Sequence, residues 1–135
     1  MTHILVIDDD EQIRELLRAM LEREGYEVVT ASNGAEGIRL HGERSADLII
    51  TDILMPVKEG ISTIHELTSK FPEVKIVAIT GGGPNGPLSH YLGMASQIGA
   101  HRVIAKPFAR RQILEAIGEL TAEIDSRASA LTSIV

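Results

Sequence analysis

The sequence predicts an α/β fold: an open, doubly wound parallel sheet of five strands in the flavodoxin-like order 2-1-3-4-5. Short apolar runs alternate five times with longer stretches of helical periodicity along the 135 residues. The runs are nearly continuous and rich in β-branched residues, as expected of strands covered on both faces. Right-handed crossovers between parallel strands then place helices on both faces of the sheet.

The expected strands lie at 4–7, 28–31, 48–51, 76–79 and 103–105. A helical stretch follows each strand, and several have recognisable ends. Asp10 is placed to cap the first helix and Gly25 to end it, whereas Asn33 opens the second. Pro72 follows the third helix and Gly99 ends the fourth. The helix faces contain Leu17 and Leu21, Ile38 and Leu40, Ile64 and Leu67, Leu88 and Leu92, and Ile117, Leu120 and Ile124, in that order.

Length and composition predict one cytoplasmic domain. We place it at residues 1–124 and expect residues 125–135, rich in serine, alanine and threonine, to form a frayed tail. Cysteine is absent, which excludes disulfides and thiolate metal sites. A formal net charge of −6 argues against direct binding to nucleic acid. No apolar stretch approaches the length of a membrane span.

Polar residues stand where four of the expected strands end. Asp8 and Asp9 follow the first strand, Asp52 the third, Thr80 the fourth and Lys106 the fifth. In a 2-1-3-4-5 sheet the first and third strands are neighbours, and ligands bind at the carboxyl edge where the strand order reverses. The three carboxylates are therefore expected to share one pocket.

Three carboxylates in one pocket favour a bound divalent cation, because like charges raise one another's pKa unless a cation joins them. Mg²⁺ fits, since it takes one or two carboxylates, keeps several waters and adds phosphate oxygens. One carboxylate can then act as a nucleophile toward a phosphoryl group. Lys106 and the Thr80 hydroxyl are placed to bind the phosphoryl oxygens.

At these residues the chain resembles the response-regulator receiver family. The family has an acidic pair after strand one, an aspartate before Leu-Met-Pro, a threonine ending strand four and a Lys-Pro-Phe motif. The matching segments are 4–10, 48–56 with Gly60, 79–80 and 104–108. Each motif alone is weak, but their order and spacing are specific, and the resemblance spans about residues 3–124.

The resemblance implies that Asp52 accepts a phosphoryl group from a phosphohistidine on a sensor kinase or phosphotransfer protein. It implies that Asp9, Asp52 and the Leu54 carbonyl ligate Mg²⁺, while Asp8 acts mainly through metal-bound water. It also implies a cis Lys106–Pro107 bond. The chain is expected to be a stand-alone phosphoacceptor switch that catalyses only its own phosphorylation and dephosphorylation, and not an enzyme in the ordinary sense.

The output side is expected to use an unknown protein target, or self-association through the fourth helix, fifth strand and fifth helix. Receivers usually carry an aromatic residue three positions before the lysine, where this chain has Val103. The loop 81–87 is unusually rich in glycine. We therefore expect backbone rearrangement of residues 81–88, and not an aromatic rotamer, to carry the signal.

Other interpretations fit less of the sequence. Gly81, Gly83 and Gly86 match a dinucleotide-binding pattern, but prolines interrupt it, and Pro87 also excludes a phosphate-binding Walker motif. The segment from Asp8 to Asp10 is similar to the nucleophile motif of haloacid-dehalogenase phosphatases, yet that interpretation leaves Asp52 unexplained. A receiver-like module that binds partners without being phosphorylated is the main alternative.

Single residues also have structural interpretations. Asp10 is expected to cap a helix, and Asp52, Thr80 or Lys106 taken alone could be a turn acid, a strand end or a surface lysine. The histidines show no metal-ligand pairing and are expected to be surface or structural residues. They are His3, His41, His65, His90 and His101.

Overall fold

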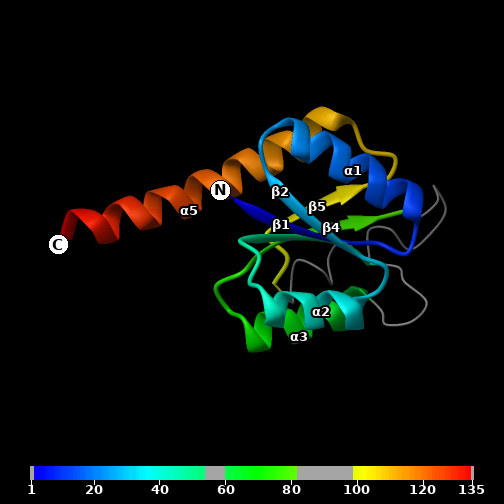
Figure 1. The fold of residues 1–135 in the computed structure, drawn as a ribbon, viewed down its shortest axis with the longest axis horizontal. Helices are drawn as coiled ribbons and strands as arrows, with labels where there is room; N and C mark the ends of the chain where they lie inside the picture. Colours follow the sequence, from blue (N-terminus) through cyan, green and yellow to red (C-terminus); the bar gives the residue numbers. More distant parts are fainter. Residues whose placement is uncertain (1, 54–59, 82–98, 135) are drawn as a thin grey trace.

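The computed structural model describes residues 2–53, 60–81 and 99–134 and confirms the predicted sheet. Five parallel strands run in the order β2-β1-β3-β4-β5 (Figure 1). The strands are β1 (His3–Ile7), β2 (Glu27–Ala31), β3 (Leu48–Asp52), β4 (Lys75–Thr80) and β5 (Arg102–Ala105). The described helices are α1 (Glu11–Arg23), α2 (Gly34–Glu43), α3 (Gly60–Lys70) and α5 (Arg110–Ile134). The fourth helix expected around Leu88 and Leu92 lies outside the described residues.

Two apolar layers cover the sheet, one on each face. Figure 1 shows α1 and α5 on one face and α2 and α3 on the other. Alternate residues of β1 pack into the two layers, because successive strand residues point to opposite faces of the sheet. Ile4 and Val6 pack with the α1 and α5 residues, whereas Leu5 and Ile7 pack with the α2 and α3 residues. The central strands are therefore buried on both sides, as their continuous apolar sequences predict.

The predicted helix ends are present. The Asp10 side chain accepts a hydrogen bond from the Gln12 amide at 2.9 Å, and Asn33 caps α2 by accepting from the Glu36 amide at 2.9 Å. Gly25, after α1, has a φ of +91°, a conformation that favours glycine. The Asp10 cap fixes where the loop that carries Asp8 and Asp9 enters α1.

Helix α2 packs closely on the sheet at Gly37. A Cβ atom there would clash with Cδ1 of Ile7, so only glycine permits the observed approach near the carboxyl end of β1. Gly42 is exposed, and a Cβ atom there would meet nothing within 4 Å. The two glycines therefore lie on the buried and the exposed face of the same helix.

The C-terminal segment differs from the expected tail. Helix α5 continues through Ile134 and extends well past the sheet in Figure 1. After Gly118 the helix contains neither glycine nor proline, so no residue type there stops it. Within the described residues, no helix is long and apolar enough to cross a membrane.

Candidate functional site

The predicted site residues meet at the carboxyl edge of the sheet. Asp8 follows β1, Asp52 ends β3 and Thr80 ends β4. The register pairs Asp52 with Ile79, and Thr80 with Ala105, which places the ends of β3, β4 and β5 side by side. One carboxylate oxygen each from Asp8, Asp9 and Asp52 lies within 4.8 Å of the others, so the three can share a cation.

Lys106 joins two of these carboxylates. Its Nζ atom lies 3.0 Å from Oδ2 of Asp8 and 3.2 Å from Oδ2 of Asp52. The Lys106 amide donates to the Thr80 carbonyl at 2.7 Å, and the Lys106–Pro107 bond is cis, as predicted. The aspartate side chains are almost fully buried, whereas the lysine side chain is 21% exposed. The lysine therefore reaches the acids from the solvent side of the pocket.

Burial and charge oppose each other in this pocket. Burial raises the pKa of Asp8, although the Asp10 amide and Lys106 partly offset this by stabilising its charged form. Burial also disfavours the charged form of Lys106, but the hydrogen bond to Asp8 and the charge of Asp52 outweigh it and raise the lysine pKa. Among the described residues, three carboxylates face one ammonium, which leaves an excess of negative charge that a divalent cation would balance.

The remaining polar groups at this edge have distinct environments. Asp9 is exposed, whereas Thr80 is fully buried, and its hydroxyl has no hydrogen-bond partner within the described part of the chain. Asp10 caps α1, as predicted, and lies outside the carboxylate group. Leu54, whose carbonyl was expected to ligate the cation, lies outside the described residues.

Two further residues shape the site, and the sequence interpretation assigned neither of them this role. Arg14 donates from Nη1 to the Asp8 carbonyl at 2.7 Å and holds the backbone of the first acid. A Cβ atom at Gly81 would lie 3.3 Å from Cδ of Lys106, so the lysine stem runs close along this backbone. Arg14 could have been found from the sequence, because it lies one helical turn after the Asp10 cap and so close to Asp8. The close contact of the Lys106 stem with Gly81 could not, because it depends on tertiary packing.

Val103 and the histidines have packing roles. Val103 is half-buried and packs against the layer that contains α3. Nδ1 of His41 accepts the Ala46 amide at 2.9 Å, and Nδ1 of His101 accepts the Ile76 amide at 3.0 Å. The structural interpretation of these two histidines is confirmed.

Comparison with known proteins agrees with this geometry. The response regulator receiver domain model matches residues 4–118, and the chain therefore belongs to the response-regulator receiver family. Receiver domains are phosphoacceptor switches of two-component systems that bind Mg²⁺ in an acidic pocket and interact with histidine kinases or phosphotransfer proteins.

Individual relatives differ in length. The chain is 35% identical over 117 residues to a CpxR homolog, a transcriptional regulatory protein of Haemophilus influenzae, covering 87% of this chain and 49% of that protein. It is 32% identical over 117 residues to the chemotaxis protein CheY of Halobacterium salinarum, covering 87% and 94%. It thus spans about half the length of the first relative and nearly all of the second.

A solved structure shows the same fold. The response regulator protein TrrA of Thermotoga maritima, in complex with Mg²⁺-BeF, superimposes with a TM-score of 0.78 at 36% identity, covering 89% of this chain and 99% of that one.

Proposed function

We propose that Asp52 is the phosphoacceptor of this receiver domain and takes its phosphoryl group from a phosphohistidine on a sensor kinase or phosphotransfer protein. The observation that carries the proposal is the double contact of Lys106 with Asp8 and Asp52. An ammonium in this position neutralises the acceptor carboxylate and can also bind the oxygens of an incoming phosphoryl group.

In the proposed reaction a carboxylate oxygen of Asp52 attacks phosphorus, so a P–O bond forms as the P–N bond to the donor histidine breaks. The leaving imidazole retains the electron pair and takes up a proton. Lys106 Nζ can then bind a phosphoryl oxygen, and the Thr80 hydroxyl, which has no partner in the described part of the chain, can donate to another. Both groups are held at strand ends before the donor arrives.

The acidic group fits Mg²⁺. Carboxylate oxygens are hard ligands, and those of Asp8, Asp9 and Asp52 are close enough to act together. The Leu54 carbonyl completes the proposed ligand set. When bound, Mg²⁺ supplies charge neutralisation and orients the phosphoryl oxygens. TrrA of Thermotoga maritima, solved with Mg²⁺-BeF, supports this proposal.

We further propose a cytoplasmic switch that binds an unknown protein target, with no direct contact to nucleic acid or membrane. Since Val103 replaces the usual aromatic residue, the proposed relay is rearrangement of residues 81–88. Dimerisation through the fourth helix, β5 and α5 is the alternative output. Equal order of residues 81–88 with and without a phosphoryl analogue would contradict the proposed relay.

Incubation with Mg²⁺ and acetyl phosphate tests the acceptor. Intact-mass spectrometry should show one added phosphoryl group, which is lost when Mg²⁺ is chelated and absent in Asp52→Asn. Asp10→Asn is the matched control, because Asp10 caps α1 outside the carboxylate group, and this variant should still be phosphorylated. If wild-type protein forms no adduct, the chain is instead an interaction module that works without phosphorylation.

A further inference from the structure

Asp8 is held by four hydrogen bonds, and one of them comes from a residue to which the proposed reaction assigns no role. The Asp8 amide donates to the Ala31 carbonyl at 3.1 Å, and its Oδ1 atom accepts from the Asp10 amide at 2.9 Å. Its Oδ2 atom accepts from Lys106 Nζ at 3.0 Å. The fourth is the 2.7 Å hydrogen bond from Nη1 of Arg14 to the Asp8 carbonyl. Arg14 therefore completes the anchoring of this buried acid.

The carbonyl that Arg14 binds belongs to the peptide group between Asp8 and Asp9. A peptide group is planar, so holding its oxygen also fixes the direction in which the chain continues to Asp9. Asp9 is exposed, and one of its carboxylate oxygens lies within 4.8 Å of those of Asp8 and Asp52. The Arg14 guanidinium thus sets the position of the second acid relative to the first.

Helix α1 holds Arg14 in place. Arg14 is half-buried one helical turn after the Asp10 cap, and its amide donates to the Asp10 carbonyl at 3.1 Å. Asp10 caps the helix, and the Arg14 side chain returns from the helix to Asp8. The loop of the three acids is therefore tied to α1 at both of its ends.

We infer that Arg14 is a positioning residue for Mg²⁺, because it holds the Asp8–Asp9 peptide group so that both carboxylates keep their geometry relative to Asp52. The inference rests on the magnesium site of the proposed function. Mg²⁺ demands nearly ideal octahedral coordination, whereas Ca²⁺ accepts flexible geometry, so a loosened acid pair should weaken Mg²⁺ binding more. Loss of a residue that orients metal ligands typically lowers metal affinity by roughly 10- to 100-fold.

The charge of Arg14 alone predicts the opposite effect. The guanidinium is a positive charge beside the cation site, so by Coulomb repulsion its removal should strengthen cation binding. Removal of a positioning contact should weaken cation binding. The sign of the change in Mg²⁺ affinity therefore distinguishes the two roles.

The test is titration of the ¹⁵N-labelled full chain with Mg²⁺ and no phosphoryl donor, followed through the amide shifts of residues 8–10 and 52. In Arg14→Met the Kd for Mg²⁺ should rise about tenfold, and the Kd for Ca²⁺ should rise less. Arg18→Met is the matched control, because Arg18 lies one turn farther along α1 and donates to Oγ1 of Thr30 at 3.0 Å. It should bind Mg²⁺ as tightly as wild type.

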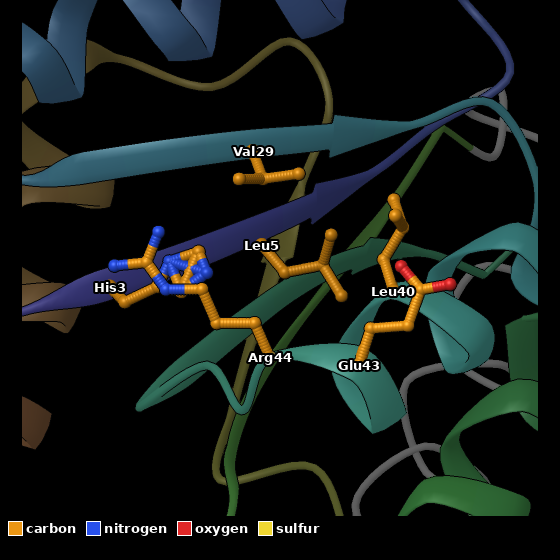
Figure 2. Close-up of a pocket in the computed structure, with 6 residues that line it drawn as sticks. All are labelled: His3, Leu5, Val29, Leu40, Glu43 and Arg44. Atoms are coloured by element: carbon orange, nitrogen blue, oxygen red, sulfur yellow. The ribbon is translucent and has the colours of Figure 1, made fainter.

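The amino end of β1 supplies an internal reference for the titration. Figure 2 shows a pocket there, and a carboxylate in its wall, that of the exposed Glu43, pairs with Arg39 at 2.8 Å. The pocket is lined by His3, Leu5, Val29, Leu40, Glu43 and Arg44. Amide shifts of these residues should change little while those of residues 8–10 saturate. Equal affinity at both ends of β1 would mean that Mg²⁺ binds the surface at large and would reject the inference.

Arg14→Lys is a second variant, which keeps both the charge and a hydrogen-bond donor. It should bind Mg²⁺ more tightly than Arg14→Met, and the reverse order would mean that charge controls the site. Unchanged or tighter Mg²⁺ binding in Arg14→Met, or an equal loss in Arg18→Met, would also overturn the inference. Similar urea midpoints of the metal-free variants establish that each is folded.

Phosphorylation by acetyl phosphate is measured separately. A wild-type chain that binds Mg²⁺ but forms no adduct would contradict the proposed acceptor and leave the role of Arg14 standing. A chain that is phosphorylated, and whose Mg²⁺ affinity is the same in Arg14→Met, would contradict the role of Arg14 alone.

Discussion

The two edges of the sheet hold buried polar side chains in opposite ways. At the carboxyl edge Asp8, Asp52 and Lys106 contact one another as charged groups, with N–O distances of 3.0 and 3.2 Å. At the amino edge His41 is 3% exposed and accepts the Ala46 amide as a neutral ring, with Phe71 packed edge-on at 4.4 Å between ring centroids. The acid cluster therefore retains its charge despite burial, whereas His41 is held as a neutral ring.

This difference distinguishes a charged cluster from a packed ring. Nδ1 of His41 and the Ala46 amide satisfy each other in one hydrogen bond. Among the described residues the acid cluster keeps excess negative charge, and the Thr80 hydroxyl beside it has no partner. The excess charge, next to a free hydroxyl, marks the carboxyl edge as a place where a ligand is expected.

The largest effect is expected from Lys106→Met. Loss of the ammonium should slow phosphorylation by acetyl phosphate about 100-fold, as removal of one oxyanion-binding donor does in other enzymes. The free energy of unfolding of the metal-free protein should fall by about 2 kcal/mol, below the usual range for a broken buried pair because the lysine is 21% exposed. Mass spectrometry and urea denaturation measure the two effects.

Arg102→Met is the matched control, because Arg102 lies on β5, the strand that Lys106 follows. Arg102 pairs with Glu119 at 3.1 Å on the surface, so its loss should change stability by at most about 0.5 kcal/mol and leave phosphorylation unchanged. Equal losses in the two variants would mean that the carboxyl edge is no more sensitive to charge than the surface is.

The next effect compares the buried and the exposed face of α2. Gly37→Ala should destabilise the protein by about 1 to 3 kcal/mol, because the new Cβ would clash with Cδ1 of the fully buried Ile7. Gly42→Ala, on the exposed face of the same helix, should stabilise it by about 0.5 to 1 kcal/mol. Thermal unfolding of both variants checks the signs, and the same sign in both would refute the close approach of the helix at Gly37.

The pH dependence of stability tests the amino edge. Burial, and then the nearby His3, lower the pKa of His41 below its ordinary value of 6.5. The unfolded chain therefore binds more protons below about pH 6.5, and stability should fall as the pH drops, by at most about 1.4 kcal/mol per pH unit for this residue.

Urea denaturation at pH 7 and pH 5 measures this loss. His41→Asn should reduce it, because the amide oxygen can accept the Ala46 amide but does not titrate, whereas His101, whose pKa burial also lowers, keeps its share of the loss. His65→Gln, on the exposed face of α3, serves as the control and should keep the wild-type pH dependence. The assignment to His41 fails if His41→Asn loses stability as steeply as wild type.

The smallest effect is expected at Asp10, which lies next to the site in sequence but caps helix α1. Asp10→Ala should cost about 0.5 to 1 kcal/mol through loss of the α1 cap, whereas Asp10→Asn should be nearly neutral, since asparagine also accepts from the Gln12 amide. Phosphorylation should persist in both variants. Loss of phosphorylation in Asp10→Asn would mean that Asp10 also takes part in the phosphorylation site.

Much of the fold and of the carboxylate arrangement could be predicted from sequence, because strand ends in a parallel sheet leave few choices. Strands β4 and β5 begin at Lys75 and Arg102, one residue earlier than predicted. The reason is that the pairing of β4 with β3, and of β5 with β4, extends beyond the apolar residues from which the strands were predicted. Tight packing at Gly37 and the burial of His3 could not be predicted, because both depend on neighbours distant in sequence.

The lysine contact has a consequence for synthesis of the chain. Lys106 meets Asp8 across 98 residues and Asp52 across 54. A nascent chain on the ribosome therefore presents Asp8 and Asp52 long before the ammonium that completes the pocket has been translated. If Asp52 is the phosphoacceptor, rapid transfer to it is expected only on a chain whose fifth strand has already been made.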